Sequence, residues 1–373
     1  MEVPLSRPSF NNLELEEIRK VLQSGWVSKG PEAETFEKLV ADYVGVKNAI
    51  AVVNCTAALH LAYLSLGIRE GDEVLVADFT FPATGHAVLY CQAKPVFVDV
   101  RPDTYNIDSI KIEECITEKT KAIVPVHCFG QSADMDSILK ISRKNNLRVV
   151  EDAACALGAT YKDKHAGSIG DIGCYSFHAR KGITTGEGGM CVTNDPRLNA
   201  RIRFLSVFGM ESAWDRESSS DYMIPEFSDV GYNYKLSDIL AAVGVVQMEK
   251  IERIIKRRQE LARYWDQKLE DIEGIHKPYS RKDVRHIYQS YVCLLDSGCN
   301  RNKVITRLKN RGVQTQIGTY ASHAQPVYKS KQRCPVSLDL MNRTLALPFY
   351  PGMQKKTIDW AAKVLKQELR ECI

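Results

Sequence analysis

The sequence predicts an α/β protein: a large domain with a mostly parallel sheet flanked by helices, then a smaller α+β domain. Between residues 47 and 192, short and nearly continuous apolar runs alternate with helical stretches, as in a parallel sheet covered on both faces. A length of 373 residues favours two domains. A charged amphipathic stretch over residues 251–272 favours a helix that bridges them. We therefore expect a large domain over residues 1–250 and a small domain over residues 251–373.

The large domain is expected to contain seven strands and at least five helices. Apolar runs of four to six residues predict the strands, and longer stretches between them predict the helices. Ser237 is expected to cap the last of these helices, whose apolar positions include Ile239, Leu240, Val243 and Val246. In chain order the other expected elements are strand 49–53, helix 56–66, strand 73–77, helix 84–91, strand 95–100, strand 122–127, helix 134–145, strand 147–151, strand 174–177, strand 190–193 and helix 199–207.

The remaining elements follow the same logic. The bridging helix should end at Gly274, and it is followed by an expected strand over 287–295, a helix over 301–310 and a last helix over 356–371. The loop over residues 211–227 is rich in serine and contains Pro225, so we expect it to be mobile.

Composition excludes several classes of function. The net charge is +4 with mixed signs, so no basic surface for nucleic acid is indicated. No apolar run approaches the roughly 18 residues of a membrane span, and the N-terminus lacks the apolar core of a signal peptide. The eleven cysteines contain no CxxC pair, so we expect neither a metal site nor disulfides. A reduced, cytoplasmic protein without nucleic-acid or membrane partners is predicted.

Lys181 is the strongest catalytic candidate. It lies between two predicted strands, on a hairpin-like turn that has four glycines within the next eight residues. A lysine held there by rigid neighbours suits an amine that forms a Schiff base with a carbonyl. A lone lysine is more often a solvated loop residue, but the groups at the other strand ends favour a Schiff-base lysine here.

Two strand ends carry groups that match parts of one ligand. After the first strand, Cys55, Thr56 and Ala57 open a helix whose free N–H groups suit a phosphate, although Thr56 also reads as a simple cap. Asp152 follows another strand and is flanked by small residues, so it can face the nitrogen of a pyridine ring. An N-cap for a following helix is the alternative for Asp152.

Three further side chains fit the same ligand. Ser176 can bond a phosphate, His178 can reach a substrate, and Phe81 can cover one face of a flat ring, with core packing as the alternative for Phe81. An aldehyde for Lys181, a ring nitrogen for Asp152 and a phosphate for Thr56 and Ser176 together describe pyridoxal 5'-phosphate.

The sequence also resembles the DegT-like nucleotide-sugar aminotransferases. These are pyridoxal phosphate enzymes with the aspartate-aminotransferase-like fold, called fold type I. The resemblance covers nearly the whole chain, and its most specific part runs from Ser176 through Lys181 to Gly189. Further matching stretches are residues 25–31, 71–74, 151–154 and 231–234.

The resemblance implies the activity and the partners. A nucleotide-linked keto-sugar becomes an amino sugar, with L-glutamate as the amino donor, in surface-polysaccharide or amino-sugar biosynthesis. Lys181 holds the cofactor and moves a proton, and once it is freed from the cofactor its pKa is expected to fall in an electropositive pocket. The enzyme is implied to be a homodimer with the active site at the interface, where Asn233 reaches the partner's cofactor phosphate.

The resemblance also implies a substrate side. Tyr320 and His323 occupy a region that lines the sugar pocket in the family, with an ordinary loop as the alternative. Trp26 and Lys29 are expected to meet the nucleotide. Which nucleotide is bound, and whether the keto group is on the third or fourth carbon, stays open.

The chain departs from the family pattern at three positions. Cys55 stands in place of a glycine beside the phosphate, Cys155 in place of Gln or His near the cofactor's hydroxyl, and Lys235 in place of Arg. Each departure affects one local contact.

Three alternatives stay open. Some relatives carry His in place of the lysine and perform dehydration, which Lys181 argues against. The same fold also supports transaminases that act on amino acids. An inactive relative that serves as a sensor or scaffold is the third.

Overall fold

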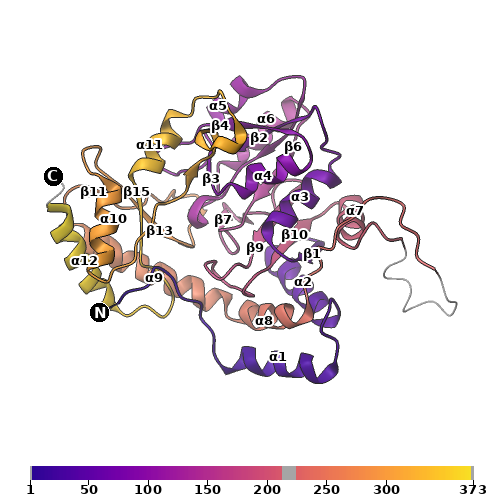
Figure 1. Ribbon diagram of the computed structural model, residues 1–373, viewed down its shortest axis with the longest axis horizontal. Coiled ribbons are helices and arrows are strands. Elements are labelled where there is room, and N and C mark those ends of the chain that lie inside the picture. Colours follow the sequence, from indigo (N-terminus) through magenta and orange to yellow (C-terminus); the bar gives the residue numbers. More distant parts are fainter. Residues whose placement is uncertain (1, 212–223, 371–373) are drawn as a thin grey trace.

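The computed structural model describes residues 2–211 and 224–370, so most of the loop expected over 211–227 lies outside the described residues. The main sheet has seven strands in the order β1-β10-β9-β6-β5-β2-β4 (Figure 1). From β9 to β4 all neighbours are parallel, while β10 runs antiparallel to both of its neighbours, which confirms a mostly parallel sheet. The strands are β1 (Asn48–Val52), β2 (Glu73–Ala77), β4 (Lys94–Val98), β5 (Thr120–Val124), β6 (Arg148–Asp152), β9 (Ile172–Ser176) and β10 (Gly189–Thr193).

These strands form where short apolar runs can be buried on both sides. All seven expected strands are present, with bounds that shift by a few residues at most. The largest shift is in β5, which ends at Val124 because Pro125 has no N–H to continue the ladder. The Pro125 carbonyl still accepts the Asp152 N–H, so the edge stays ordered beside β6.

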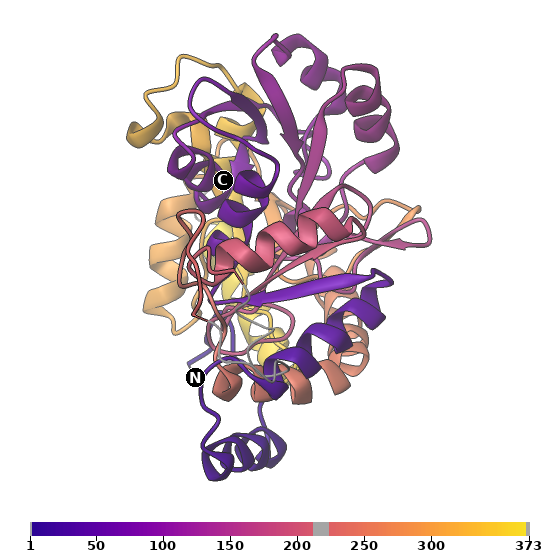
Figure 2. The ribbon, with the colours of Figure 1, turned by 90° about the vertical axis from the view of Figure 1, so that its right-hand side faces the viewer.

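Helices cover both faces of the sheet because alternate strand residues point to opposite sides. Ile50 and Val74 pack with α3, α4 and α7 on one face, whereas Ala51 and Leu75 pack on the other, with α2, α8 and α6. Figure 2 shows β1 between α7 and α2. The helices are α2 (Pro31–Val44), α3 (Cys55–Ser65), α4 (Ala83–Tyr90), α6 (Met135–Lys144), α7 (Pro196–Ser206) and α8 (Asp238–Glu249).

The helix caps explain where several of these helices begin. Ser237 accepts a hydrogen bond from the Leu240 N–H, which confirms it as the cap of α8. Two further helices, α1 (Asn12–Ser24) and α2, were not predicted. The sequence contains a start signal for each helix: Asn11 and Glu14 form a capping box before α1, and Pro31 occupies the first turn of α2.

The C-terminal part has its own apolar core, built on α9 (Ile251–Leu269). A small sheet joins β11 (Ile275–His276), β13 (Tyr291–Leu295) and β15 (Thr344–Leu347), and α10 (Arg301–Asn310) and α12 (Lys355–Arg370) pack on it. β13 begins at Tyr291 rather than at 287, because the Ile287 and Gln289 N–H groups bond the carbonyls of Gly130 and Phe129.

Several contacts join the two parts of the chain. β14 (Tyr320–Ala321) pairs with β3 (Phe79–Thr80), and Val3 is buried in the C-terminal core. The domain boundary at residue 250 stays a prediction. The other short elements are α5 (Ser109–Ile112), β7 (Thr160–Tyr161), β8 (Lys164–His165), β12 (Val284–Arg285) and α11 (Pro335–Arg343). Among the helices in the described ranges, none is both long and apolar enough to cross a bilayer.

Candidate active site

The carboxyl ends of β1, β6 and β9 meet at one edge of the sheet. Ser176 at the end of β9 pairs with Gly189 at the start of β10. Gly189 lies so close to the start of α3 that a Cβ there would stand 2.4 Å from the Asn54 carbonyl and 2.6 Å from the Cys55 nitrogen. Glycine is therefore required for this approach, which brings Ser176 beside the N-terminus of α3.

The N-terminus of α3 is preorganised for an anion. The Asn54 side chain accepts the Ala57 N–H at 2.8 Å, so Asn54, and not Thr56, is the cap. Thr56 is half-buried, and within the described residues its hydroxyl makes no hydrogen bond. The Cys55 and Thr56 N–H groups, at the first two positions of α3, have no acceptor within the helix, and free N–H groups at a helix start favour phosphate.

Asp152 ends β6 and its carboxylate is held at both oxygens. One oxygen accepts the Ala154 N–H at 3.1 Å, and the other accepts the Thr84 hydroxyl at 2.7 Å. The side chain is buried. No helix follows Asp152 in this described stretch, because the chain turns over residues 154–158, so the N-cap alternative is wrong.

A neighbouring buried carboxylate fixes this strand end. Glu151 accepts the N–H groups of Gly167, Ile169 and Gly170 at 2.6–2.8 Å and contacts His127 Nε2 at 2.8 Å. Because His127 Nδ1 accepts the Ala133 N–H at 3.1 Å, its proton is on Nε2 and is donated to Glu151. Neither residue was singled out from the sequence.

Lys181 lies on the turn between the antiparallel strands β9 and β10, as predicted. Its backbone N–H bonds the His178 carbonyl at 2.9 Å, and its Nζ stands 3.2 Å from Cys155 Sγ. Burial alone would lower the pKa of Lys181, but Cys155, Cys55 and Asp152 together raise that pKa above its ordinary value. Without the cofactor the pKa of Lys181 is therefore not lowered, and a lowered pKa for the lysine released beside a bound cofactor stays a prediction.

An aromatic pair borders this cluster. Phe81 directly follows β3 and is 65% exposed, so the core-packing alternative is wrong. Its ring centroid lies 6.2 Å from that of Tyr320, which β14 places against β3. His178 is half-buried, and its Nε2 lies 3.8 Å from Glu187.

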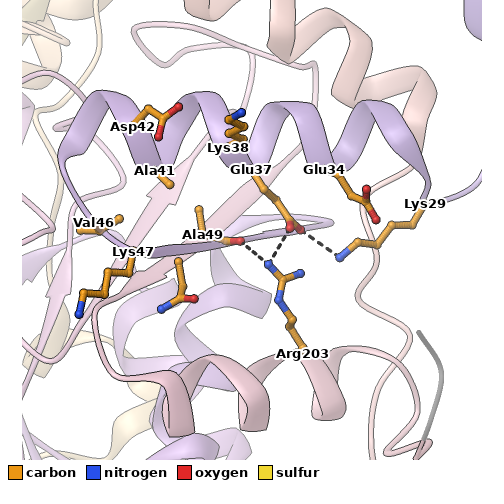
Figure 3. Close-up of a pocket in the computed structure, with 11 residues that line it drawn as sticks. Lys29, Glu34, Glu37, Lys38, Ala41, Asp42, Val46, Lys47, Ala49 and Arg203 are labelled. Carbon is orange, nitrogen blue, oxygen red and sulfur yellow. Dashed lines mark hydrogen bonds and ion pairs between the residues drawn. The ribbon is translucent and has the colours of Figure 1, made fainter. Parts of the chain in front are cut away.

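Lys29 was expected to meet the nucleotide. In this structure its ammonium is instead held in a buried ion pair, which corrects that expectation. Its Nζ pairs with Glu37 Oε1 at 3.0 Å, with the two side chains 2% and 6% exposed (Figure 3). Glu37 also pairs with Arg203 at 2.8 Å. Trp26 is half-exposed, and its indole N–H is donated to the Lys29 carbonyl at 3.3 Å.

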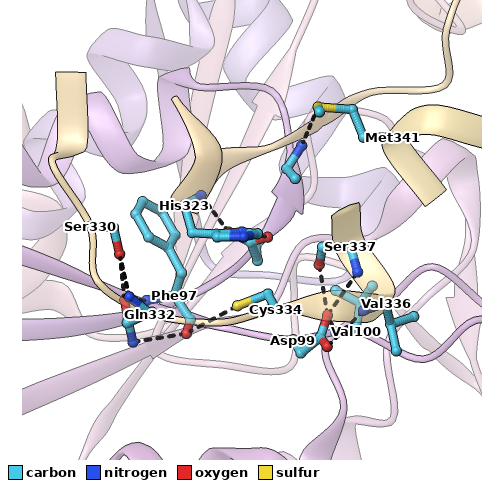
Figure 4. Close-up of polar contacts among 12 residues, drawn as sticks. Phe97, Asp99, Val100, His323, Ser330, Gln332, Cys334, Val336, Ser337 and Met341 are labelled. Atoms are coloured by element: carbon cyan, nitrogen blue, oxygen red, sulfur yellow. Dashed lines mark hydrogen bonds and ion pairs between the residues drawn. The ribbon is translucent and has the colours of Figure 1, made fainter. Parts of the chain in front are cut away.

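His323 is bonded to the end of β2 (Figure 4). Asp78 accepts the His323 backbone N–H at 2.6 Å and its ring Nδ1–H at 2.7 Å, and this second bond raises the pKa of His323. Cys334 Sγ lies within 4.8 Å of both groups. Because both Asp78 oxygens already accept hydrogen bonds, this cluster reads as a polar contact between elements and not as a metal centre.

Asn233 lies on an exposed segment beside the end of β1. Its side-chain oxygen accepts a hydrogen bond from Lys235, and the next residue, Tyr234, accepts the Val53 N–H at 2.9 Å. The structure therefore brings Cys55, Thr56, Ala57, Asp152, Cys155, Ser176 and Lys181 to one sheet edge, with Phe81 tied to Asp152 through Thr84. It does not place the ammonium of Lys29 there.

Known proteins resemble this chain in sequence and in fold. The model of the DegT/DnrJ/EryC1/StrS aminotransferase family matches residues 8–366. The chain belongs to this family. The family member is 40% identical over 367 residues to the spore coat polysaccharide biosynthesis protein SpsC of Bacillus subtilis, which covers 96% of this chain and 94% of that protein. It is 38% identical over 379 residues to the GDP-perosamine synthase of Caulobacter vibrioides, with 98% of each chain covered.

A solved structure supports the fold and the cofactor. Spr1654 of Streptococcus pneumoniae in its PLP form superposes with a TM-score of 0.93 and 25% identity, with all of both chains covered. This DegT-family chain is thus a fold type I, pyridoxal phosphate-dependent sugar aminotransferase. The residues present fit that cofactor, because the start of α3 beside Gly189, the buried Asp152 carboxylate and the Lys181 amine are groups suited to its phosphate, ring nitrogen and aldehyde.

Proposed function

We propose that this enzyme transfers the amino group of L-glutamate to a keto-sugar linked to a nucleotide. The observation that carries the proposal is the meeting of Lys181, Asp152 and the start of α3 at one sheet edge. SpsC and GDP-perosamine synthase, by their names, belong to polysaccharide and nucleotide-sugar chemistry, which supports a role in making amino sugars for surface polysaccharide.

Each residue of the cluster has a distinct role. Bound pyridoxal phosphate supplies an electron sink that stabilises negative charge on the reacting carbon. Lys181 would hold the cofactor, and its free amine would take and return the proton of that carbon. Asp152 faces the ring nitrogen, while the α3 N-terminus and Ser176 hold the phosphate. Cys155, at 3.2 Å from Lys181, would stand beside the cofactor hydroxyl, and Phe81 would cover a ring face.

The sugar enters between the large domain and the β14 region. Tyr320 is paired to β3 beside the exposed Phe81, and His323 follows within three residues. These side chains and His178 supply ring faces and hydrogen-bond donors suited to a sugar. Trp26, half-exposed at the N-terminal end, is proposed to stack on the nucleotide base.

The enzyme acts as a homodimer in which Asn233 completes the partner's phosphate site. Asn233 is exposed, and large apolar side chains near it in the sequence or on the adjoining helices are exposed as well. A monomer rarely leaves such a group uncovered. The exposed apolar side chains are Tyr90, Phe208, Phe227 and Val230. The ten cysteines in the described residues are all free, which supports a cytoplasmic enzyme.

A product assay tests this proposal. The enzyme loaded with pyridoxal phosphate is given glutamate and a panel of nucleotide-linked 3-keto- and 4-keto-sugars, and the products are identified by mass spectrometry. We expect an amino sugar from one keto position, and none from the Lys181→Ala variant. If glutamate is consumed and no keto-sugar of the panel gains nitrogen, the sugar assignment is wrong and an amino-acid transaminase is indicated. Loss of a sugar hydroxyl would indicate a dehydratase.

A further inference from the structure

We propose that Thr84 is a positioning residue for Asp152, and that a buried relay from Thr80 through Thr84 fixes the orientation of the Asp152 carboxylate. Thr84 Oγ1 lies 2.7 Å from Asp152 Oδ2 and 3.1 Å from Thr80 Oγ1. All three side chains are buried, at 1%, 5% and 3% exposure for Thr84, Asp152 and Thr80. The inference rests on the role that the proposed function gives to Asp152.

The donors in this relay follow from chemistry. An ionised carboxylate only accepts hydrogen bonds, so Thr84 donates its single hydroxyl proton to Asp152. The contact between the two threonines must then be donated by Thr80. The Phe81 carbonyl competes for the same Thr84 proton, but it lies 3.3 Å away and is uncharged. A short bond to a charged acceptor is the stronger one, so the relay runs from Thr80 to Thr84 to Asp152.

The relay and the backbone hold the carboxylate from two sides. Thr84 binds Oδ2 and the Ala154 N–H binds Oδ1 at 3.1 Å. A carboxylate with both oxygens held in this way cannot rotate about its Cβ–Cγ bond without breaking a hydrogen bond. Its remaining lone pairs, about two of the four, stay available for a ring nitrogen. Without Thr84 only the longer backbone contact would set the carboxylate plane.

Residues 80–84 carry both the side chain proposed to cover the cofactor's ring face and the hydroxyl that positions the carboxylate at the ring's edge. Thr80 belongs to β3, Phe81 follows it, and Thr84 lies in the first turn of α4. β3 is in turn fixed by its pairing of Thr80 with Tyr320. One turn of the chain therefore carries the proposed ring-stacking side chain and the hydroxyl that aims the carboxylate at the ring nitrogen.

Substitutions at Thr84 test this role. Thr84→Val removes the hydroxyl at nearly constant shape, and Thr84→Ser keeps it. The readouts are the dissociation constant of pyridoxal phosphate and the pH midpoint of the absorption band of the bound cofactor. We expect Thr84→Val to raise the dissociation constant about tenfold, as for a lost hydrogen bond to a charged group, and to lower the midpoint. Thr84→Ser should stay within about threefold of the wild type.

Controls separate positioning from stability. Thr193→Val removes an equally buried hydroxyl at the far end of β10, where it bonds the Asp171 carbonyl at 2.8 Å, and it should leave both readouts unchanged. If Thr84→Val does not fold, Thr84→Ala, which adds no bulk, takes its place with the same expectation. Thr80→Val should move both readouts in the same direction by a smaller amount.

The outcomes distinguish this inference from the proposed function. Asp152→Asn should shift the pH midpoint by more than any threonine variant does. If Asp152→Asn shifts it and neither Thr84→Val nor Thr84→Ala does, the relay is refuted while the role of Asp152 stands. If Asp152→Asn also leaves the band unchanged, the role of Asp152 in the proposed function fails.

Discussion

At the scale of single residues, charge pairing decides which side chains are available for chemistry. Glu37 pairs with two cations, the buried Lys29 and the partly exposed Arg203, and it also accepts the Ala51 N–H at 2.9 Å. This cluster fastens α2 to β1 and α7, so the sequence position of Lys29 near Trp26 was misleading. A lysine that neutralises a buried carboxylate is structural, because withdrawing it would leave that charge unpaired.

Removing the Lys29 charge should therefore affect stability and spare substrate binding. We expect Lys29→Met to lower the free energy of unfolding by about 3 kcal/mol, at the low end for a broken buried pair because Arg203 still faces Glu37. Urea unfolding measures the loss, and Lys38→Met on the exposed side of α2 is the matched control. An increased KM for the sugar at unchanged stability would return Lys29 to the substrate site.

His323 and Asp78 predict a pH dependence of stability. Because the bond to Asp78 raises the pKa of folded His323 above its ordinary value, this contribution is complete below about pH 6.5. It is lost as the pH rises through the raised pKa. The stability difference between wild type and His323→Gln, measured by urea unfolding from pH 6 to 9, should shrink with rising pH. A difference that is constant over this range would show that His323 is neutral throughout.

At the scale of elements, the site depends on how closely β10 approaches the start of α3. Gly189 has no side chain, and a Cβ at this position would overlap the Asn54 backbone. The strand and the helix start can therefore pack this closely only with glycine at this position. The sequence motif contains this glycine, but only the structure shows which backbone it faces.

Gly189→Ala should separate the strand from the helix and weaken the phosphate site. We expect the dissociation constant of pyridoxal phosphate to rise at least tenfold, with about 1–3 kcal/mol of lost stability from the overlap. Gly182→Ala is the control, because a Cβ there meets nothing within 4 Å. Fluorescence titration with the cofactor checks both variants, and equal affinities would contradict the close-approach argument.

The strands and the site residues at their ends could be predicted from the sequence, because they depend on local sequence patterns. The parallel strands are short apolar runs with clear ends, Asp152 is the last residue of one strand, and Lys181 lies between two others. Contacts between distant segments have no such signal. Thr84 and Asp152 are 68 residues apart, and the N–H groups of Ile287 and Gln289 bond a loop of the large domain, which shortens β13.

At the scale of the whole molecule, the two subunits of the proposed homodimer should share each active site. Lys181 and Asn233 then act in different chains, and a mixture of two inactive variants can recover activity. We expect Lys181→Ala and Asn233→Ala homodimers to be impaired, while subunits mixed by partial unfolding and refolding regain up to about a quarter of wild-type activity, because half the dimers are mixed and each has one intact site. Activity that does not rise on mixing would place both residues in one chain's site.

The proposed attachment of the cofactor to the ε-amine of Lys181 can be trapped directly. Native enzyme loaded with pyridoxal phosphate is reduced with borohydride, digested, and its peptides are mapped by mass spectrometry. We expect a phosphopyridoxyl group on Lys181 that is absent from the Lys181→Ala variant. A peptide map in which Lys181 is unmodified, or in which another lysine alone carries the group, would contradict it.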